Sequence, residues 1–247
     1  QALRHASKGR LHQLFVLDGR TRLSNAFLCA ALLLLSPMLA AQNYINKKWV
    51  QSTGQPDNLN WTASTLDVYQ DLIVVGNTQT APGVSAVWVT KYDALGDELW
   101  QRTYSGTAGA NNHGVAVVTN ASGDVFVAAT LSNSGTDLDL AVLKYDLGGT
   151  LAWVAQWNGP SNLADVPAAL ALDSAGNIFI CGASFTDPIY ADFALVKISP
   201  AGTVLWSKTY DHAGLLDAAA AVEIDPDGHA VVLGISAPNN MSWDIAA

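Results

Sequence analysis

From residue 49 onward, short apolar runs alternate with turns rich in Gly, Asp, Ser and Pro. In the clearest copy of this pattern, the apolar runs cover residues 168–172, 178–183, 193–198 and 203–210. Asp, Ser and Pro initiate tight turns, and Gly accepts the positive φ that closes them. Short turns of this kind join neighbouring antiparallel strands. The pattern therefore predicts four antiparallel strands per unit, and it contains no helical period.

The central runs are apolar at consecutive positions, as in Val125-Phe-Val-Ala-Ala and Ile178-Phe-Ile-Cys. An antiparallel sheet with one face in water would instead alternate apolar and polar residues. A strand that is apolar on both faces needs a packed layer on each side, which stacked four-stranded blades supply. We therefore expect an all-β fold in which each sheet is packed between two others.

Two markers show that the unit repeats about every 52 residues. The first is a lysine, a turn and a tryptophan, which recur at Lys91, Lys144 and Lys197 and at Trp100, Trp153 and Trp206. The second is a turn glycine ahead of an apolar run, at Gly123, Gly176 and Gly228, and the first unit has Gln70 in its place. Four-stranded units of this length match β-propeller blades. The large indole rings are expected to fill equivalent positions between blades.

The repeat region spans residues 42–247, and we assign its blades to 49–100, 101–153, 154–206 and, in part, 207–247. The fourth unit reaches residue 247 before its expected lysine. Propellers close with about 4–8 blades. The expectation is an incomplete propeller of three full blades and part of a fourth, with further blades or another domain downstream in the same chain.

Residues 1–41 read as a leader followed by a signal peptide. Residues 26–41 are strongly apolar, Arg20 and Arg22 precede them, and Ala40 and Ala41 close them. A basic segment, an apolar core of about 7–15 residues and a small-residue exit are typical of a secretory signal peptide. A membrane span needs about 20 apolar residues, so a retained anchor is the alternative. Because the first Met is Met38, residues 1–20 are expected to be a non-native leader, and the product to be secreted or held at the cell surface.

Without residues 1–41 the chain keeps 7 basic and 20 acidic residues, a formal net charge of −13. This charge argues against nucleic acid and anionic membrane as partners. Cys181 is then the one remaining cysteine, so an internal disulfide is excluded and a buried structural thiol is expected.

Three segments of the third unit together resemble the SBBP-type β-propeller repeats of exported bacterial proteins. They are Asp-Ser-Ala-Gly-Asn-Ile-Phe-Ile-Cys-Gly (173–182), Asp-Phe-Ala-Leu-Val-Lys (192–197) and Gly-Thr-Val-Leu-Trp (202–206). The resemblance covers residues 49–247, and the first unit departs from it most, with Ala86 in place of the acid. It implies an exported or surface-associated scaffold and offers no catalytic residue to carry over.

Asn112, Asp165 and Asp217 recur at one place in successive units, just before the first strand. If that strand lined a central channel, these side chains could form a polar ring that holds calcium, which prefers oxygen ligands. The alternative is that each side chain caps a turn by bonding to backbone. Asp139, Asp192 and Asp244 also recur, either as a ligand-facing row or as structural partners, for example of Lys144 or Lys197. No cofactor is otherwise indicated.

The sequence contains no Gly-x-Ser-x-Gly elbow, phosphate loop or metal-ligand histidine spacing. Asp225-Pro-Asp-Gly lacks the rest of a calcium loop. We therefore expect a binding or structural module without intrinsic catalysis, which contacts protein, glycan or a surface polymer. The alternatives are a quinoprotein-type propeller enzyme, which the Asp-turn-Trp run 93–100 also resembles, and a passive spacer for a C-terminal domain.

Overall fold

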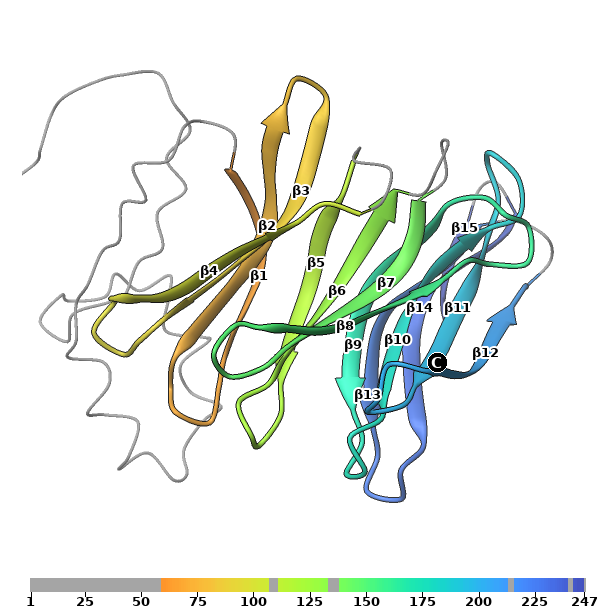
Figure 1. Ribbon diagram of the computed structural model, residues 1–247. Coiled ribbons are helices and arrows are strands. Elements are labelled where there is room, and N and C mark those ends of the chain that lie inside the picture. The colour runs from red at the N-terminus through yellow and green to blue at the C-terminus, as the bar shows by residue number, and fades with distance from the viewer. Residues whose placement is uncertain (1–58, 107–110, 133–137, 213–215, 240–241, 247) are drawn as a thin grey trace, which may run out of the picture. The chain divides into compact units, whose positions relative to one another are not determined.

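The computed structural model describes residues 59–106, 111–132, 138–212, 216–239 and 242–246 (Figure 1). The chain divides into two compact units, one of Gln1–Asp57 with Leu95–Asp97 and one of Asn58–Ala94 with Glu98–Ala247. The second unit carries all of the strands, and the described residues contain no helix. Accordingly, no helix within these ranges has the length and apolar character that crossing a membrane requires. The proposed signal peptide lies outside the described residues.

Within the described residues, fifteen strands form four antiparallel sheets, each a simple meander in chain order (Figure 1). Sheet 1 contains β1 (Leu59–Leu66), β2 (Leu72–Ala81), β3 (Val84–Tyr92) and β4 (Glu98–Tyr104). Sheet 2 contains β5 (His113–Thr119), β6 (Val125–Ser132), β7 (Leu138–Tyr145) and β8 (Leu151–Trp157). Sheet 3 contains β9 (Asp165–Leu172), β10 (Ile178–Phe185), β11 (Ala191–Ile198) and β12 (Val204–Tyr210). Sheet 4 contains β13 (Asp217–Ile224), β14 (Ala230–Asn239) and β15 (Ser242–Ala246).

The expected all-β class and the four-stranded unit are confirmed by this topology. The four apolar runs predicted for the third unit coincide with β9 to β12 to within a few residues. The sheets end four residues beyond the tryptophans at which the blades were divided, at Tyr104, Trp157 and Tyr210. The difference arises because each tryptophan is the third residue of a fourth strand, so a boundary there cuts the strand.

The turn between the first and second strands of each sheet is built from one side chain and one left-handed residue. In sheet 3, Oδ1 of Asp173 accepts hydrogen bonds from the backbone N–H groups of Ala175 (3.0 Å) and Asn177 (2.8 Å). Gly176 adopts φ +79°, which a residue without Cβ does at little cost. Sheet 1 has the same turn, but its left-handed residue is Gln70, with φ +66°. Because Gln70 carries a Cβ, its backbone is strained at this position.

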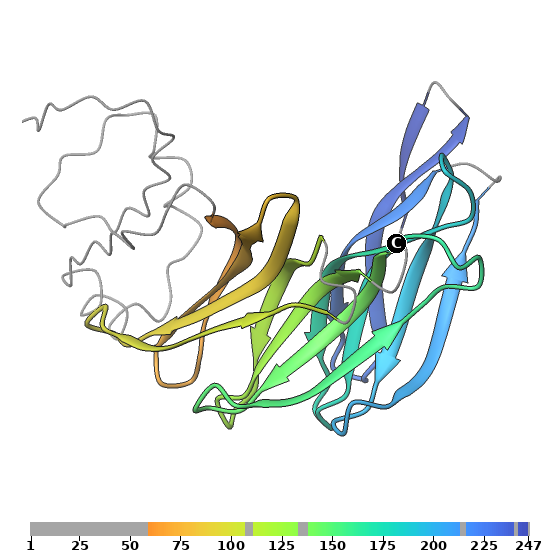
Figure 2. The same cartoon turned by 45° about the horizontal axis from the view of Figure 1, so that its top comes forward.

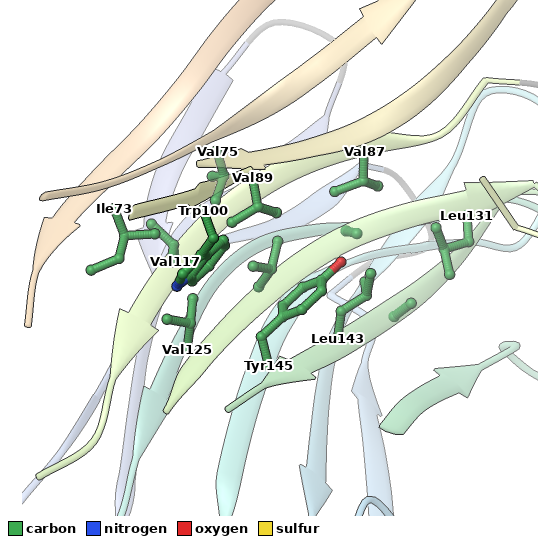
Figure 3. Close-up of a cluster of buried hydrophobic side chains, with 13 residues drawn as sticks. Ile73, Val75, Val87, Val89, Trp100, Val117, Val125, Leu131, Leu143 and Tyr145 are labelled. Atoms are coloured by element: carbon green, nitrogen blue, oxygen red, sulfur yellow. The ribbon is translucent and has the colours of Figure 1, made fainter. Parts of the chain in front are cut away.

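The second strands explain why their sequences are apolar at every position. All eight residues of β6 are buried, and its apolar side chains alternate between two different cores. Val125, Val127 and Ala129 pack with residues of sheet 1, including Val75 and Trp100 (Figure 3). Phe126 and Ala128 point the other way and pack with sheet 3. The expectation that each such strand has a packed layer on both sides is therefore met in sheet 2.

A third core joins sheets 3 and 4, and it contains the cysteine. Cys181 packs with Phe179 and Phe193 of sheet 3 and with Ala219 and Val222 of sheet 4. The thiol is fully buried, as expected, and burial raises its pKa to about 11. It therefore stays protonated at neutral pH and is not poised as a nucleophile.

We call the face that a sheet turns toward the next sheet in chain order its forward face. The forward faces of sheets 1, 2 and 3 are each covered by the following sheet, and Figure 2 shows the same succession of sheets as Figure 1. On sheet 4 the corresponding side chains of β14 are exposed, with Val231 at 51%, Leu233 at 45% and Ile235 at 41%. The register places Val231 and Leu233 where β10 has Phe179 and Cys181, both buried.

Candidate functional site: the polar connections and tryptophan contacts between sheets

Each connection between sheets is held by the polar residue that opens the next sheet. Asn112, Asp165 and Asp217 are all fully buried. Oδ2 of Asp165 accepts a hydrogen bond from the backbone N–H of Gly159 (2.6 Å), and Oδ2 of Asp217 accepts one from His212 (2.6 Å). Both donors lie in the chain segment that leads into the sheet, so these carboxylates fasten the connection to the first strand.

Asn112 also fastens a connection between sheets, but it does so through a side-chain amide and with different partners. Its Nδ2 donates to the carbonyl oxygen of Ser85 in sheet 1 (3.0 Å), and its Oδ1 accepts from the N–H of Ser132 in sheet 2 (3.0 Å). The side chain thus ties neighbouring sheets together. For all three candidate calcium ligands, the contacts are those of the capping alternative. Among the described residues, neither Asp165 nor Asp217 belongs to a group of three or more His, Cys, Asp or Glu side chains with convergent ligand atoms.

The number of carboxylates increases from the first connection between sheets to the last. The third strand of sheet 1 carries Ala86 at the place where sheet 2 has Asp139 and sheet 3 has Asp192. In sheet 3, Asp165, Ser184 and Asp192 lie opposite one another on three neighbouring strands. Burial and then the charges of Asp211 and Asp217 raise the pKa of Asp192. The junction of sheets 3 and 4 is therefore the most strongly acidic of the three.

The repeated lysines form ion pairs with acids in the turn between the first two strands. Nζ of Lys91 lies 2.6 Å from Asp67 and 3.1 Å from Asp71, and this lysine is only 1% exposed. Nζ of Lys144 lies 2.9 Å from Asp124, and Nζ of Lys197 lies 3.5 Å from Asp173. These turn acids, rather than Asp139 or Asp192, are the partners that the structure gives the lysines.

The second and third lysines also lie over phenylalanine rings of their own sheets. Nζ of Lys144 is 5.3 Å from the ring centroid of Phe126, and that of Lys197 is 4.6 Å from Phe179. Such contacts stabilise a partly exposed ammonium by about 0.5–1 kcal/mol. Each lysine therefore connects its third strand to the neighbouring turn and to the second strand, which is a structural role.

The first two repeated tryptophans make the same contact with the following sheet. Nε1 of Trp100 donates to the carbonyl oxygen of Leu147 (3.1 Å), and Nε1 of Trp153 donates to that of Pro200 (3.2 Å). Both acceptors lie in the turn between the third and fourth strands of the next sheet. The glycine of that turn lies under the indole: a Cβ on Gly149 would come within 2.6 Å of Trp100, and one on Gly202 within 2.7 Å of Trp153.

We call this combination of indole N–H donor, carbonyl acceptor and underlying glycine the tryptophan latch. Figure 3 shows Trp100 lying between the strands of sheet 1 and Tyr145 of sheet 2, and the two rings stack with centroids 6.0 Å apart. Arg102 extends the same latch, because its Nε donates to the carbonyl oxygen of Gly149 (2.7 Å). Trp100 and Trp153 thus take the equivalent positions between sheets that the repeat predicted.

Trp206 keeps only half of this arrangement. It contacts Phe179 of its own sheet, with ring centroids 6.0 Å apart, much as Trp153 contacts Phe126 at 6.2 Å. It is nevertheless 37% exposed. No described residue accepts a hydrogen bond from its indole, because sheet 4 has no described turn after its third strand.

Within the described residues, the one group of three ligand-type side chains is Asp225, Asp227 and His229, whose atoms lie within 4.8 Å of one another. Asp225 uses Oδ1 to accept from the N–H groups of Asp227 (3.0 Å) and His229 (2.8 Å). This is the turn that Asp173 builds in sheet 3, with His229 in the place of Asn177. The group is thus accounted for as the fourth copy of a structural turn.

Three histidines of the repeat region, His113, His212 and His229, occupy positions that differ between units. Burial lowers the pKa of His113, the first residue of β5, and so favours the neutral form of its imidazole. Nδ1 of His229 lies 3.1 Å from Asp225 in the turn just described, and that of His212 lies 3.5 Å from the hydroxyl of Tyr210. These contacts do not build a nucleophile with an adjacent base.

Comparison with family models and with curated proteins found no match for this chain. The site has therefore to be interpreted from its own geometry. Sequence reasoning located the repeated tryptophans, lysines and acids. It missed two contacts, the pairing of each lysine with the acid of the first turn and the glycine beneath each indole of the preceding sheet. The signal for the second was present, since Gly149 and Gly202 follow Trp100 and Trp153 at one constant spacing of 49 residues.

Proposed function

We propose that the chain is an exported β-propeller-type repeat scaffold that binds or supports another macromolecule and has no catalytic activity of its own. One observation carries the proposal: the same latch, built from the same residue types, joins sheet 1 to sheet 2 and sheet 2 to sheet 3. Conserving such a contact from sheet to sheet builds a regular stack. The repeated lysines, the first two repeated tryptophans, the turn residues and the set Asn112, Asp165 and Asp217 are accounted for by capping, ion pairing and packing.

The propeller assignment and the kinship with SBBP-type repeats belong to this proposal. They are supported by the four-stranded meanders, by the face-to-face cores and by the motifs at 173–182, 192–197 and 202–206. Further blades of the same chain fit as partners, since the forward face of sheet 4 is apolar and exposed. Protein or glycan is the partner class that suits an acidic surface, whereas nucleic acid and anionic membrane do not.

A direct test sets binding against turnover. Residues 42–247 would be incubated with insoluble cell-envelope glycans and surface proteins, and separately with panels of glycoside, ester and quinone-dependent dehydrogenase substrates. The proposal expects cosedimentation with a macromolecule and no turnover. Turnover that disappears in one of His113→Ala, His212→Ala or His229→Ala would overturn it, because these side chains differ between the repeats.

Export is tested separately. Residues 1–57 would be fused to an alkaline phosphatase reporter that is active only outside the cytoplasm. We expect activity from the fusion and loss of activity in Leu34→Arg, because an arginine interrupts the apolar core that a signal peptide requires. Equal activity of the two fusions would remove the basis for proposing secretion or surface display.

A further inference from the structure

Trp206 is the third copy of a latch whose first two copies are closed. Its own-sheet contact is already made, since Phe179 lies against it as Phe126 lies against Trp153. The indole is therefore held in the orientation of a closed latch, while its other side is exposed. An exposed indole with an unused N–H next to a packed core is typical of a docking residue.

The two closed latches define the chemistry of the occupant. In each, the carbonyl acceptor comes two residues before a glycine of positive φ, at Leu147 and Gly149 and at Pro200 and Gly202. The glycine N–H donates back to Asp146 or Ser199, which opens the turn. The occupant is thus a turn of the form Asp/Ser-x-x-Gly between two antiparallel strands.

The two closed latches also show which strands that turn connects. In both closed latches it joins the third and fourth strands of the sheet that follows the tryptophan. For Trp206 the sheet that follows is sheet 4. Its β15 is a third strand by register, because Asp244 lies opposite Ser236 as Asp192 lies opposite Ser184.

We propose that Trp206 is the docking residue for a hairpin of this same repeat that continues β15, and that this hairpin places an Asp/Ser-x-x-Gly turn against the indole. The proposal rests on the repeat scaffold proposed above and identifies one contact by which a further part of the array is held. In this contact the indole N–H of Trp206 donates a hydrogen bond to a backbone carbonyl oxygen of the occupant. The glycine of the occupant's turn lies against the indole, where the Cβ of any other residue would collide with the ring.

The chain supplies its own probe for this site. Because residue 244 corresponds to Asp192, residue 247 corresponds to Leu195, and a copy of residues 196–210 appended after Ala247 completes the third strand, the turn and a fourth strand. A matched control carries Gly202→Val in the appended copy alone, which puts a Cβ where the indole lies. Trp206→Phe identifies the indole N–H signal of Trp206.

Hydrogen exchange of the indole N–H groups is the readout, with Trp100 and Trp153 as closed references in the same molecule. In the parent chain we expect Trp206 to exchange fastest of the three. In the extended chain we expect its exchange to slow by about tenfold or more, as for a proton that is released only by local opening. The glycine-to-valine control is expected to return it toward the parent rate.

Each other outcome overturns the proposal. Trp206 could already be as protected as Trp153 in the parent chain, or the extension could leave its exchange unchanged, whether or not the tail folds. If the valine control protected the indole N–H of Trp206 equally well, the contact would not require a glycine beneath the indole. Equal protection by the free peptide 196–210 added to the parent chain would replace continuation of β15 by docking from a second molecule. None of these readouts depends on turnover or glycan binding, so failure here is distinct from failure of the proposed function.

Discussion

Sheet 2 and sheet 4 are made from similar strand sequences, yet they differ in what covers them. On sheet 2, both faces of β6 are buried. On β14 of sheet 4, the residues facing sheet 3 are packed, whereas Val231, Leu233 and Ile235 on the forward face are exposed. The apolar pattern of a strand therefore records which faces the fold is built to cover, and the neighbouring sheet alone decides whether they are covered.

Sheet 4 also departs in one residue of that face. Opposite Val231, β13 carries Glu223, whereas sheets 2 and 3 carry Val118 and Ala171 at the corresponding position. Glu223 is exposed. A sheet that covers this face has to offer Glu223 a cation or leave it at the rim, because a buried unpaired carboxylate is costly. The covering partner of sheet 4 is therefore expected to differ locally from sheets 2 and 3.

The largest contrast is expected from leucine truncation on the two forward faces. Leu140 of sheet 2 is fully buried, and Leu233 of sheet 4 is 45% exposed. We expect Leu140→Ala to lower the free energy of unfolding by about 3–4 kcal/mol, since it leaves a cavity. Leu233→Ala should lower it by less than about 1 kcal/mol, because little apolar area is lost. Urea unfolding of the two variants measures the difference, and equal losses would show that sheet 4 is covered in solution.

A second contrast concerns the lysines. Lys91 is buried with two carboxylates, whereas Lys197 is partly exposed with one. Lys91→Met leaves Asp67 buried without its cation, so we expect a loss of about 3 kcal/mol. Lys197→Met should lose about 0–1 kcal/mol, as solvent-exposed ion pairs do. Thermal unfolding of both variants at low and high salt checks the ranking, and a salt-sensitive loss at Lys91 would contradict burial of its ion pair.

These contrasts separate the features that can be predicted from the sequence from those that cannot. The repeat, the four strands and the buried thiol followed from local pattern, because turn chemistry and strand hydrophobicity act over a few residues. The partners of Lys144 and Asn112 did not follow, since they depend on which strands lie side by side and in what register. Trp206 resembles Trp100 and Trp153 in sequence, and its exposure depends on a neighbour rather than on its own residues.

The third contrast tests the latch through its glycines. Gly149 and Gly228 share a positive φ, but a Cβ would meet Trp100 at Gly149 and nothing within 4 Å at Gly228. Gly228→Ala should therefore lose about 1 kcal/mol for the left-handed backbone alone. Gly149→Ala adds the collision, and we expect a loss of about 2–3 kcal/mol in total. Chemical denaturation of the pair tests this, and equal losses would mean that the indole moves aside freely.

The smallest effect is expected at the acidic junction of sheets 3 and 4, and it depends on pH. Burial first, and the charges of Asp211 and Asp217 second, raise the pKa of Asp192 in the folded chain. A carboxyl whose folded pKa is raised costs stability when it is ionised, so the cost is complete above the folded pKa and vanishes below the unfolded value of about 3.9. Asp192→Asn should therefore unfold at a higher temperature than the parent at pH 7 and show no such advantage near pH 3. We expect a gain of less than about 1 kcal/mol, since solvent screens a half-buried carboxylate.

Asp211→Asn serves as the matched variant, because removing the neighbouring charge should raise stability in the same direction by a smaller amount. Melting curves of the three chains across this pH range decide the matter, and a parent chain that is more stable at pH 7 than Asp192→Asn would show that the ionised carboxylate is favourably bound at this junction.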